Sequence, residues 1–190
     1  DSHGVHLVPR YLENVKNNVL NPNVHITVES DLGPILQLHG NMGYGQIIGG
    51  EAMELGIARA SEVGVAIVTL RYTHHLGRIG AWGEMCADAG MVSIHYVNVI
   101  GHHPLVSPFG GAEARYATNP YCTAIPAPPG GKPIVLDMAT SKIAMGKVAV
   151  AHNKGVEVPE GSLINPNGAP TRDPGVMYRE ERGALLPFGD

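Results

Sequence analysis

Apolar and polar residues alternate with two periods along the chain, and these periods predict its strands and helices. A helix is predicted over Val5 to Asn18. A period of two then predicts strands at residues 25–30 and 35–39, joined into a hairpin by the turn Asp31-Leu32-Gly33-Pro34. A helical period follows and ends at Gly64, a favourable C-cap. Its expected apolar face consists of Ala52, Met53, Leu55, Ile57, Ala58 and Ala60.

The apolar run from Val65 to Leu70 predicts a buried strand. A helix at Ala81–Ala89 and a strand at Met91–Val99 follow it, so the three elements are expected to form a βαβ unit with parallel strands. Further strands are expected at 123–126 and 133–136, and a further helix from Ala144 to His152. From Gly155 onward the sequence is rich in Pro, Gly and Asn and predicts irregular structure.

The stretch Thr69–Trp82 connects a predicted strand to a predicted helix and carries the most promising chemistry. It contains His74, His75, Gly77 and Arg78. Backbone N–H groups at a helix start point outward, and glycines let a ligand approach the backbone closely. Histidine exchanges a proton near neutral pH. This turn is therefore the predicted active site.

Composition excludes several other classes of protein. The chain has 44% apolar and 16% charged residues, a globular balance, and a net charge of −4 without a cluster of Lys or Arg that would indicate nucleic-acid binding. No apolar run approaches the roughly 18 residues that a membrane span needs. Cys86 and Cys122 have no metal or redox spacing, so we expect reduced, buried thiols in a cytoplasmic protein.

A second glycine-rich stretch, Gly40–Gly50, follows a strand and precedes a helix, but it does not match the dinucleotide fingerprint. Gly43 and Gly45 fit the first two glycines, whereas the third position is Ile48. No acidic residue follows at the usual distance. The stretch is interpreted as a glycine-rich entry into a packed helix that does not bind a pyrophosphate.

Ten histidines require that a metal site be considered. The pairs His74/His75 and His102/His103 are adjacent in sequence and lack the spacing of helical zinc ligands. No G-x-S-x-G nucleophile motif is present either. Histidine acid/base chemistry coupled to a cofactor is the interpretation that these residues favour, and a His-rich metal-dependent hydrolase is kept as an alternative.

Five motifs, in order over essentially the whole chain, resemble the malate/L-lactate dehydrogenase family, a group of NAD(P)-dependent enzymes without a Rossmann fold. They are Asp1–Gly4 with Pro9-Arg10-Tyr11, Thr73–Gly80, Pro108–Gly111, Ala117–Pro120, and Asp137–Ser141 with Gly146-Lys147. The later stretch Val156–Ile164 with Asn167-Gly168 is most similar to the hydroxycarboxylate dehydrogenase B branch.

The resemblance implies a mixed-sheet α/β cofactor domain, a homodimer, NAD or NADP as cofactor, and a small 2-hydroxy or 2-oxo acid as substrate. It implies that His75, His3 and Ser2 are catalytic and that Arg10, Thr118 and Asn119 contact the substrate. The residues that it implies for cofactor binding are His3, Gly77, Arg78, Ile79, Val135, Leu136, Asp137, Met138 and Ala139. No metal and no nucleic acid or membrane partner is implied.

Two positions depart from relatives of this family. Several relatives carry an arginine where Leu7 stands, which leaves Arg10 as the nearest group for a substrate carboxylate. Lys147 replaces an aspartate of piperideine-type relatives, which argues against an imine substrate and favours a 2-hydroxy acid.

The family pattern also gives an expectation for domain organisation. Residues 1–30 are expected to belong to a helical, substrate-side region and residues 31–190 to the NAD(P)-binding domain, with segments missing at both ends. On this view the expected function is an NAD(P)-dependent 2-hydroxyacid dehydrogenase, and this chain by itself is expected to be inactive. A non-catalytic fragment is the other open alternative.

Overall fold

The computed structural model of the protein describes residues 3–101 and 103–189, apart from the side chain of His6. The chain forms two compact units. The first unit comprises His3–Ile94 and Cys122–Leu136, and the second comprises His95–Tyr121 and the chain from Asp137 onward. The sequence analysis expects residues 1–30 to lie on the substrate side and residues 31–190 to bind the cofactor. This division by role stays a prediction.

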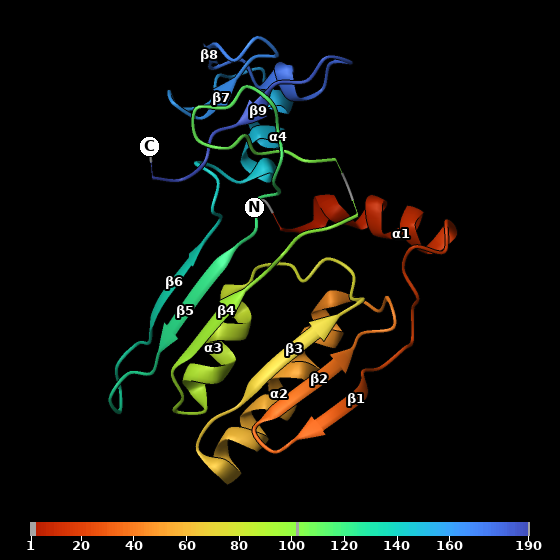
Figure 1. Ribbon diagram of the computed structural model, residues 1–190, viewed down its shortest axis with the longest axis vertical. Helices are drawn as coiled ribbons and strands as arrows, with labels where there is room; N and C mark the ends of the chain where they lie inside the picture. Colours follow the sequence, from red (N-terminus) through yellow and green to blue (C-terminus); the bar gives the residue numbers. More distant parts are fainter. Residues whose placement is uncertain (1–2, 102, 190) are drawn as a thin grey trace. The chain divides into compact units, whose positions relative to one another are not determined.

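The elements follow one another in a mixed α/β order (Figure 1). The helices are α1 (Val8–Lys16), α2 (Gly45–Val63), α3 (Gly80–Asp88) and α4 (Met145–Lys154), with short 3-10 turns η1 (Val5–Leu7) and η2 (Pro174–Met177). The strands are β1 (Thr27–Leu32), β2 (Ile35–His39), β3 (Ile67–Arg71), β4 (Ser93–Tyr96), β5 (Tyr121–Ile125), β6 (Ile134–Met138), β7 (Leu163–Ile164), β8 (Pro170–Thr171) and β9 (Ala184–Leu185).

The predicted hairpin is confirmed at the start of the first unit. β1 and β2 pair antiparallel, and Gly33 turns the chain between them with a φ of 60°, where a glycine is unstrained. β2 then pairs in parallel with β3, in register from Ile35 opposite Ile67 to His39 opposite Arg71. The sheet order is therefore β1-β2-β3.

Helix α2 covers this sheet and ends where the sequence predicts. Its residue Ala52 is fully buried in a cluster with Leu36 and Leu38 of β2, and Gly64 caps the helix in the left-handed conformation with a φ of 87°. The buried stripe, however, runs through Ile48, Ala52 and Gly56 at a spacing of four, while Ala58 is exposed. The apolar-face prediction was wrong at Ala58 because the helix turns a buried glycine, rather than an alanine, toward the sheet.

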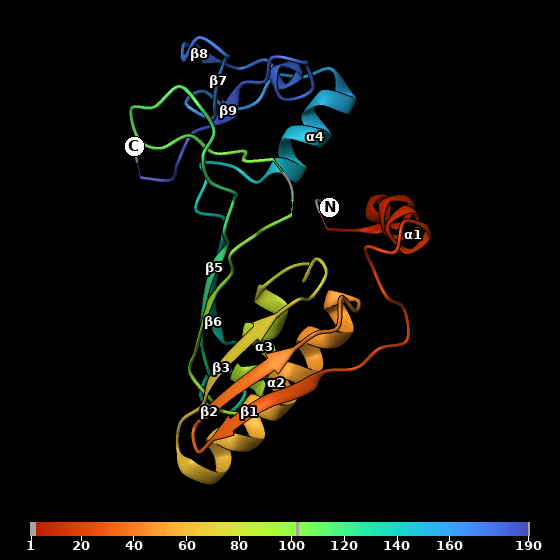
Figure 2. The same ribbon diagram turned by 45° about the vertical axis from the view of Figure 1, so that its right-hand side comes forward.

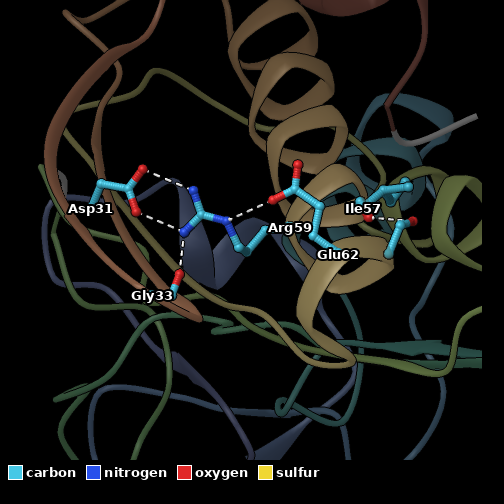
Figure 3. A network of polar contacts seen from close by, with 6 residues as sticks. Asp31, Gly33, Ile57, Arg59 and Glu62 are labelled. Atoms are coloured by element: carbon cyan, nitrogen blue, oxygen red, sulfur yellow. Dashed lines mark hydrogen bonds and ion pairs between the residues drawn. The ribbon is translucent and has the colours of Figure 1, made fainter.

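A guanidinium group fastens the hairpin turn to α2. Arg59 donates to both carboxylate oxygens of Asp31, at 2.7 and 2.8 Å, and to the Gly33 carbonyl (Figure 3). Glu62, one helical turn further along α2, lies 3.7 Å from the same guanidinium. The arginine thus holds the turn against the helix through a bidentate pair rather than through a single contact.

The predicted βαβ unit from β3 to β4 is wrong. β4 belongs to a second sheet with order β4-β5-β6, and the parallel partner of β3 is β2, connected through α2. The hydrophobic pattern marks a strand but does not specify its neighbour, which explains the error. β3 is also not buried on both faces, since the Ile67 side chain is 55% exposed. α3 packs beside α2 (Figure 2).

The second unit has more order than the sequence suggests. Beyond Gly155 a small sheet forms with order β8-β7-β9, and α4 packs beside η2. Val148 of α4, Leu163 and Leu185 are fully buried in one apolar cluster there. The prediction of irregular structure holds for most of this segment but missed these short elements, because strands of two residues leave no periodic pattern.

Two smaller expectations can also be compared with the fold. Cys86 and Cys122 are free, buried thiols, as predicted. Within the described residues, none of the helices is both long enough and apolar enough to traverse a lipid bilayer.

Candidate active site

The predicted active-site turn lies between β3 and α3, and the start of α2 supports its backbone. The His74 N–H donates to the Gly43 carbonyl at 3.1 Å. A Cβ atom added to Gly45 would lie 2.2 Å from the His75 carbonyl oxygen, which is closer than any side chain permits. Gly45 therefore lets α2 begin directly against the backbone of the histidine pair.

Two side chains of helix α1 contact the rings of His74 and His75. The Tyr11 hydroxyl lies 2.7 Å from His75 Nδ1, and Asn14 Nδ2 lies 2.8 Å from His74 Nε2. Tyr11 and Asn14 are three positions apart on α1, so they share one face of the helix. The Tyr11 ring also meets the His74 ring edge-on, with centroids 5.3 Å apart. One helix thus fixes two adjacent imidazoles.

The structure brings His3 and His75 together, as expected of two catalytic candidates. Their rings are stacked, with centroids 5.6 Å apart and planes within 3°. Ser2, the third catalytic candidate, lies outside the described residues. The roles of all three residues stay predictions.

The surroundings of His75 keep its ring neutral. Burial, followed by the positive charges of His3, Arg10 and His74, lowers the His75 pKa from its ordinary value of 6.5 to about 4. Burial and Arg10 likewise lower the pKa of the buried His74. The exposed Arg10 precedes Tyr11 on α1, so the residue expected to bind the substrate carboxylate acts electrostatically on the same site.

The turn from Gly77 to Ile79 has the character of an anion site. Gly77 has a φ of 74°, and α3 begins at Gly80 without a side-chain cap or an acidic residue in its first turn. Such a helix start favours negative charge. Arg78 adds a guanidinium beside it and pairs with Glu84 through contacts of 2.9 and 2.5 Å. The binding of a dinucleotide phosphate at this turn stays a prediction.

The glycines of the mismatched fingerprint serve packing. A Cβ on Gly43 would meet Ile48 and Val24 within 3 Å, and a Cβ on Gly45 would overlap the His75 backbone. These contacts support the interpretation of a tightly packed helix entry, and the absence of pyrophosphate binding there stays a prediction.

Other predicted site residues belong to the second unit. Thr140 Oγ1 lies within 3.1 Å of the Thr118 carbonyl and within 3.0 Å of the Asn119 carbonyl, which joins two of the resemblance motifs. Asn119 has a φ of 27°, and its side-chain oxygen accepts from the Val99 N–H. An open cavity of about 300 Å³ lies beside Asn119, with Arg115 and Tyr116 also in its lining.

The proposed cofactor segment on β6 spans both units. Val135 and Leu136 end the part assigned to the first unit, and Asp137, Met138 and Ala139 begin the next part of the second. The role of this segment stays a prediction.

Sequence reasoning missed three residues that hold the histidines, namely Tyr11, Asn14 and Gln46. Gln46 Nε2 donates to the Tyr11 hydroxyl at 3.0 Å. The polar spacing of Tyr11 and Asn14 on a predicted helix was a usable signal. Gln46 gave no such signal, because it contacts Tyr11, which is 35 positions away in the sequence. Across the described part of the chain, no three His, Cys, Asp or Glu side chains are grouped to hold a metal ion.

Comparison with known proteins identifies the family. A family model described as malate/L-lactate dehydrogenase matches residues 1–190. The chain belongs to the malate/L-lactate dehydrogenase family. Its mixed α/β fold agrees with this assignment, because solved structures of malate and sulfolactate dehydrogenases superpose on it.

Individual relatives include dehydrogenases of several hydroxy acids. The chain is 45% identical to hydroxycarboxylate dehydrogenase B of Escherichia coli K12 over 190 residues, and 45% identical to L-lactate dehydrogenase of Cupriavidus necator over 188 residues. These matches cover 100% and 99% of this chain but only 52% and 54% of the relatives. The chain therefore spans about half the length of the curated relatives that it matches.

A solved structure agrees closely in fold. An E. coli protein assigned as a malate/lactate dehydrogenase gives a TM-score of 0.95 at 46% identity, covering 100% of this chain and 52% of that one.

Proposed function

We propose that the protein is an NAD(P)-dependent oxidoreductase that interconverts a 2-hydroxy acid and a 2-oxo acid. Membership of a dehydrogenase family supports this proposal. The single observation that carries it is the His75 ring, which is partly buried, bonded to Tyr11 and stacked on His3 beside an anion-favouring turn. These contacts support the proposal that His75 exchanges a proton beside a bound dinucleotide.

Different residues of the chain would bind the cofactor, bind the substrate and transfer the proton. A nicotinamide dinucleotide supplies the hydride when it is bound. Gly77, Arg78 and Ile79 would hold it at the turn, and the segment Val135–Ala139 would line it from β6. Arg10 would bind the substrate carboxylate, with Thr118 and Asn119 as further substrate contacts. His75 or His3 would give the proton to the oxygen at C2, and Ser2 is the third proposed catalytic residue.

Two further features of the proposal come from the family pattern. Lys147 favours a 2-hydroxy acid over an imine as substrate. A homodimer in the cytoplasm is the expected form of the protein, and the choice between NAD and NADP is left to experiment.

A turnover assay tests the proposal. NADH and NADPH consumption is measured with pyruvate, oxaloacetate and phenylpyruvate, on the 190-residue chain and on a polypeptide extended to the relatives' length. His75→Asn should lower kcat by about 10²–10⁴-fold, the usual contribution of a positioned acid/base group. His25→Asn is the matched control, because His25 is exposed and pairs with Glu51 instead.

The outcomes separate the alternatives. If His75→Asn keeps its turnover within a few fold, the assignment of His75 is wrong and His3 becomes the candidate. Cofactor titration that shows no binding to the extended polypeptide supports the non-catalytic alternative. A hydrolytic activity that is lost on addition of a chelator supports the metal-dependent hydrolase instead, because a nicotinamide enzyme should not respond to a chelator.

A further inference from the structure

The hydrogen bonds around Tyr11 form a chain with a defined direction. Gln46 Nε2 donates to the Tyr11 hydroxyl at 3.0 Å, and the same hydroxyl lies 2.7 Å from His75 Nδ1. An amide NH₂ group only donates, so the Tyr11 oxygen accepts from Gln46. Within the described residues, His75 Nδ1 is the only acceptor found for the Tyr11 O–H. The Gln46 N–H occupies one of the two acceptor positions of the Tyr11 oxygen, and the hydroxyl proton is assigned to the contact with Nδ1.

This direction fixes the tautomer of the imidazole. A nitrogen that accepts a hydrogen bond carries no proton, and a neutral imidazole has one N–H. We propose that Tyr11 is a positioning residue that holds neutral His75 in the Nε2–H tautomer, and that Gln46 sets the direction of the tyrosine hydroxyl. The tautomer rests on this direction of the hydroxyl proton, whereas its use in proton transfer rests on the proposed function.

The contact between Tyr11 and His75 offers a way for a neutral histidine to act as an acid. Reduction of a 2-oxo group leaves an alkoxide oxygen at C2 that must take up one proton. If neutral His75 gave its Nε2 proton without replacement, an imidazolate would remain. The low pKa of His75, about 4, means that an imidazolium is scarce near neutrality.

A relay through Tyr11 balances the protons. The Nε2–H bond breaks as the proton passes to the alkoxide, while the Tyr11 O–H bond breaks and its proton passes to Nδ1. The Tyr11 phenolate that remains accepts the Gln46 N–H bond and regains a proton from water. The net transfer is downhill, because tyrosine has a pKa of about 10 and an alcohol about 16, close to water.

Nitrogen NMR tests the tautomer without any assay of activity. The protein is labelled with 15N-histidine, and His75→Asn identifies the His75 signals. We expect the Nε2–H pattern in the unmodified protein and a mixture of both tautomers in Tyr11→Phe. Gln46→Met, which keeps Tyr11, should give a smaller shift in the same direction. Tyr44→Phe is the matched control and should leave the pattern unchanged, since Tyr44 touches the Tyr11 ring edge-on without bonding to either histidine.

The pH dependence of turnover tests the relay. In single-turnover reduction, Tyr11→Phe should lower the rate at least 10-fold near pH 7 with little change in KM. Its rate should then rise on acidification, about 10-fold per pH unit, because only imidazolium can supply the proton. The rate of the unmodified protein should not change with pH over this range. Its solvent isotope effect should indicate that two protons move in the same step.

Specific results would overturn the inference. An Nδ1–H pattern for His75 in the unmodified protein would refute the tautomer, and a flat profile for Tyr11→Phe would refute the relay. If the Nε2–H pattern is found while the extended polypeptide binds no nicotinamide cofactor and shows no turnover, the tautomer stands and the proposed function fails. The two proposals are thus decided by separate measurements.

Discussion

Individual residues around His75 oppose the protonation of its ring. Each charge that acts on its pKa, from His3, Arg10 and His74, lowers it. Such surroundings disfavour a further positive charge and favour an anionic ligand near the ring, as a 2-oxo acid carboxylate would be. The same electrostatics therefore keep the ring neutral and would suit a carboxylate ligand.

The lowered pKa of His75 predicts a stability that falls with acidification. The ring has a pKa of about 4 when folded and 6.5 when unfolded, so between these values the unfolded chain binds more protons. The free energy of unfolding should therefore rise as the pH increases from 4 to 6.5 and should fall as the pH decreases through the same range. His75→Asn should reduce this dependence by up to about one proton. Chemical denaturation at a series of pH values measures the slope, and an unchanged slope would contradict the lowered pKa.

Arg10 is predicted to act on both the substrate and the histidine. Arg10→Met should raise KM for 2-oxo acids about 10–100-fold, because a charge-assisted bond contributes about 1.5–3 kcal/mol. It should also raise the His75 pKa by removing a repulsive charge. Kinetics and NMR titration measure the two effects. Lys16→Met, at the end of the same helix, is the control. A KM change without a pKa change would place Arg10 away from the ring.

At the scale of elements, the candidate active-site turn is held by three helices. α1 bonds its rings, the start of α2 contacts its backbone, and Trp82 of α3 donates its Nε1–H to the Leu76 carbonyl at 3.2 Å. The ring of Trp82 also packs close to Gly49 of α2. Movement of any one helix would therefore displace the histidine pair.

The close approach of α2 to the turn predicts a sharp difference between two glycine substitutions. Gly45→Ala places a methyl group on the His75 carbonyl and should destabilise the fold by about 1–3 kcal/mol, the usual range for overpacking, and lower turnover. Gly50→Ala on the same helix meets only Trp82 at 3.9 Å and should be neutral, or stabilising by up to about 1 kcal/mol. Thermal unfolding and the turnover assay compare the two variants. Equal effects would show that the contact at Gly45 is not what holds the turn.

Elements that are specified by residues close together in the sequence could be predicted. The way in which strands pair with one another could not. The hairpin at Gly33, helix α2 with its cap at Gly64 and the histidine turn each depend on residues close in sequence. The neighbour of β3 and the sheet β8-β7-β9 depend on contacts between distant segments. The same division holds in the candidate site, where the sequence draws attention to His75 but not to its contact with Tyr11, 64 residues away.

At the scale of the whole molecule, the chain matches its relatives throughout while spanning about half of their length. Its exposed apolar side chains are one physical sign of contacts beyond this chain. β6 is an edge strand of the sheet β4-β5-β6, and Ile134 and Leu136 on it are 68% and 49% exposed. The two residues are two positions apart on a strand, so they share one face. An apolar edge strand pairs readily with another chain.

We predict that the 190-residue chain by itself associates through β6. Sedimentation or light scattering should show oligomers that grow with concentration, and Ile134→Thr with Leu136→Thr should reduce them, because the pair removes the apolar face while keeping residues that favour strands. Val63→Thr is the control, since Val63 is a single exposed apolar residue at the end of α2. A polypeptide of the relatives' length should associate less through this strand if its added segments cover β6. A monodisperse monomer at high concentration would show that the edge of β6 is already protected within this chain.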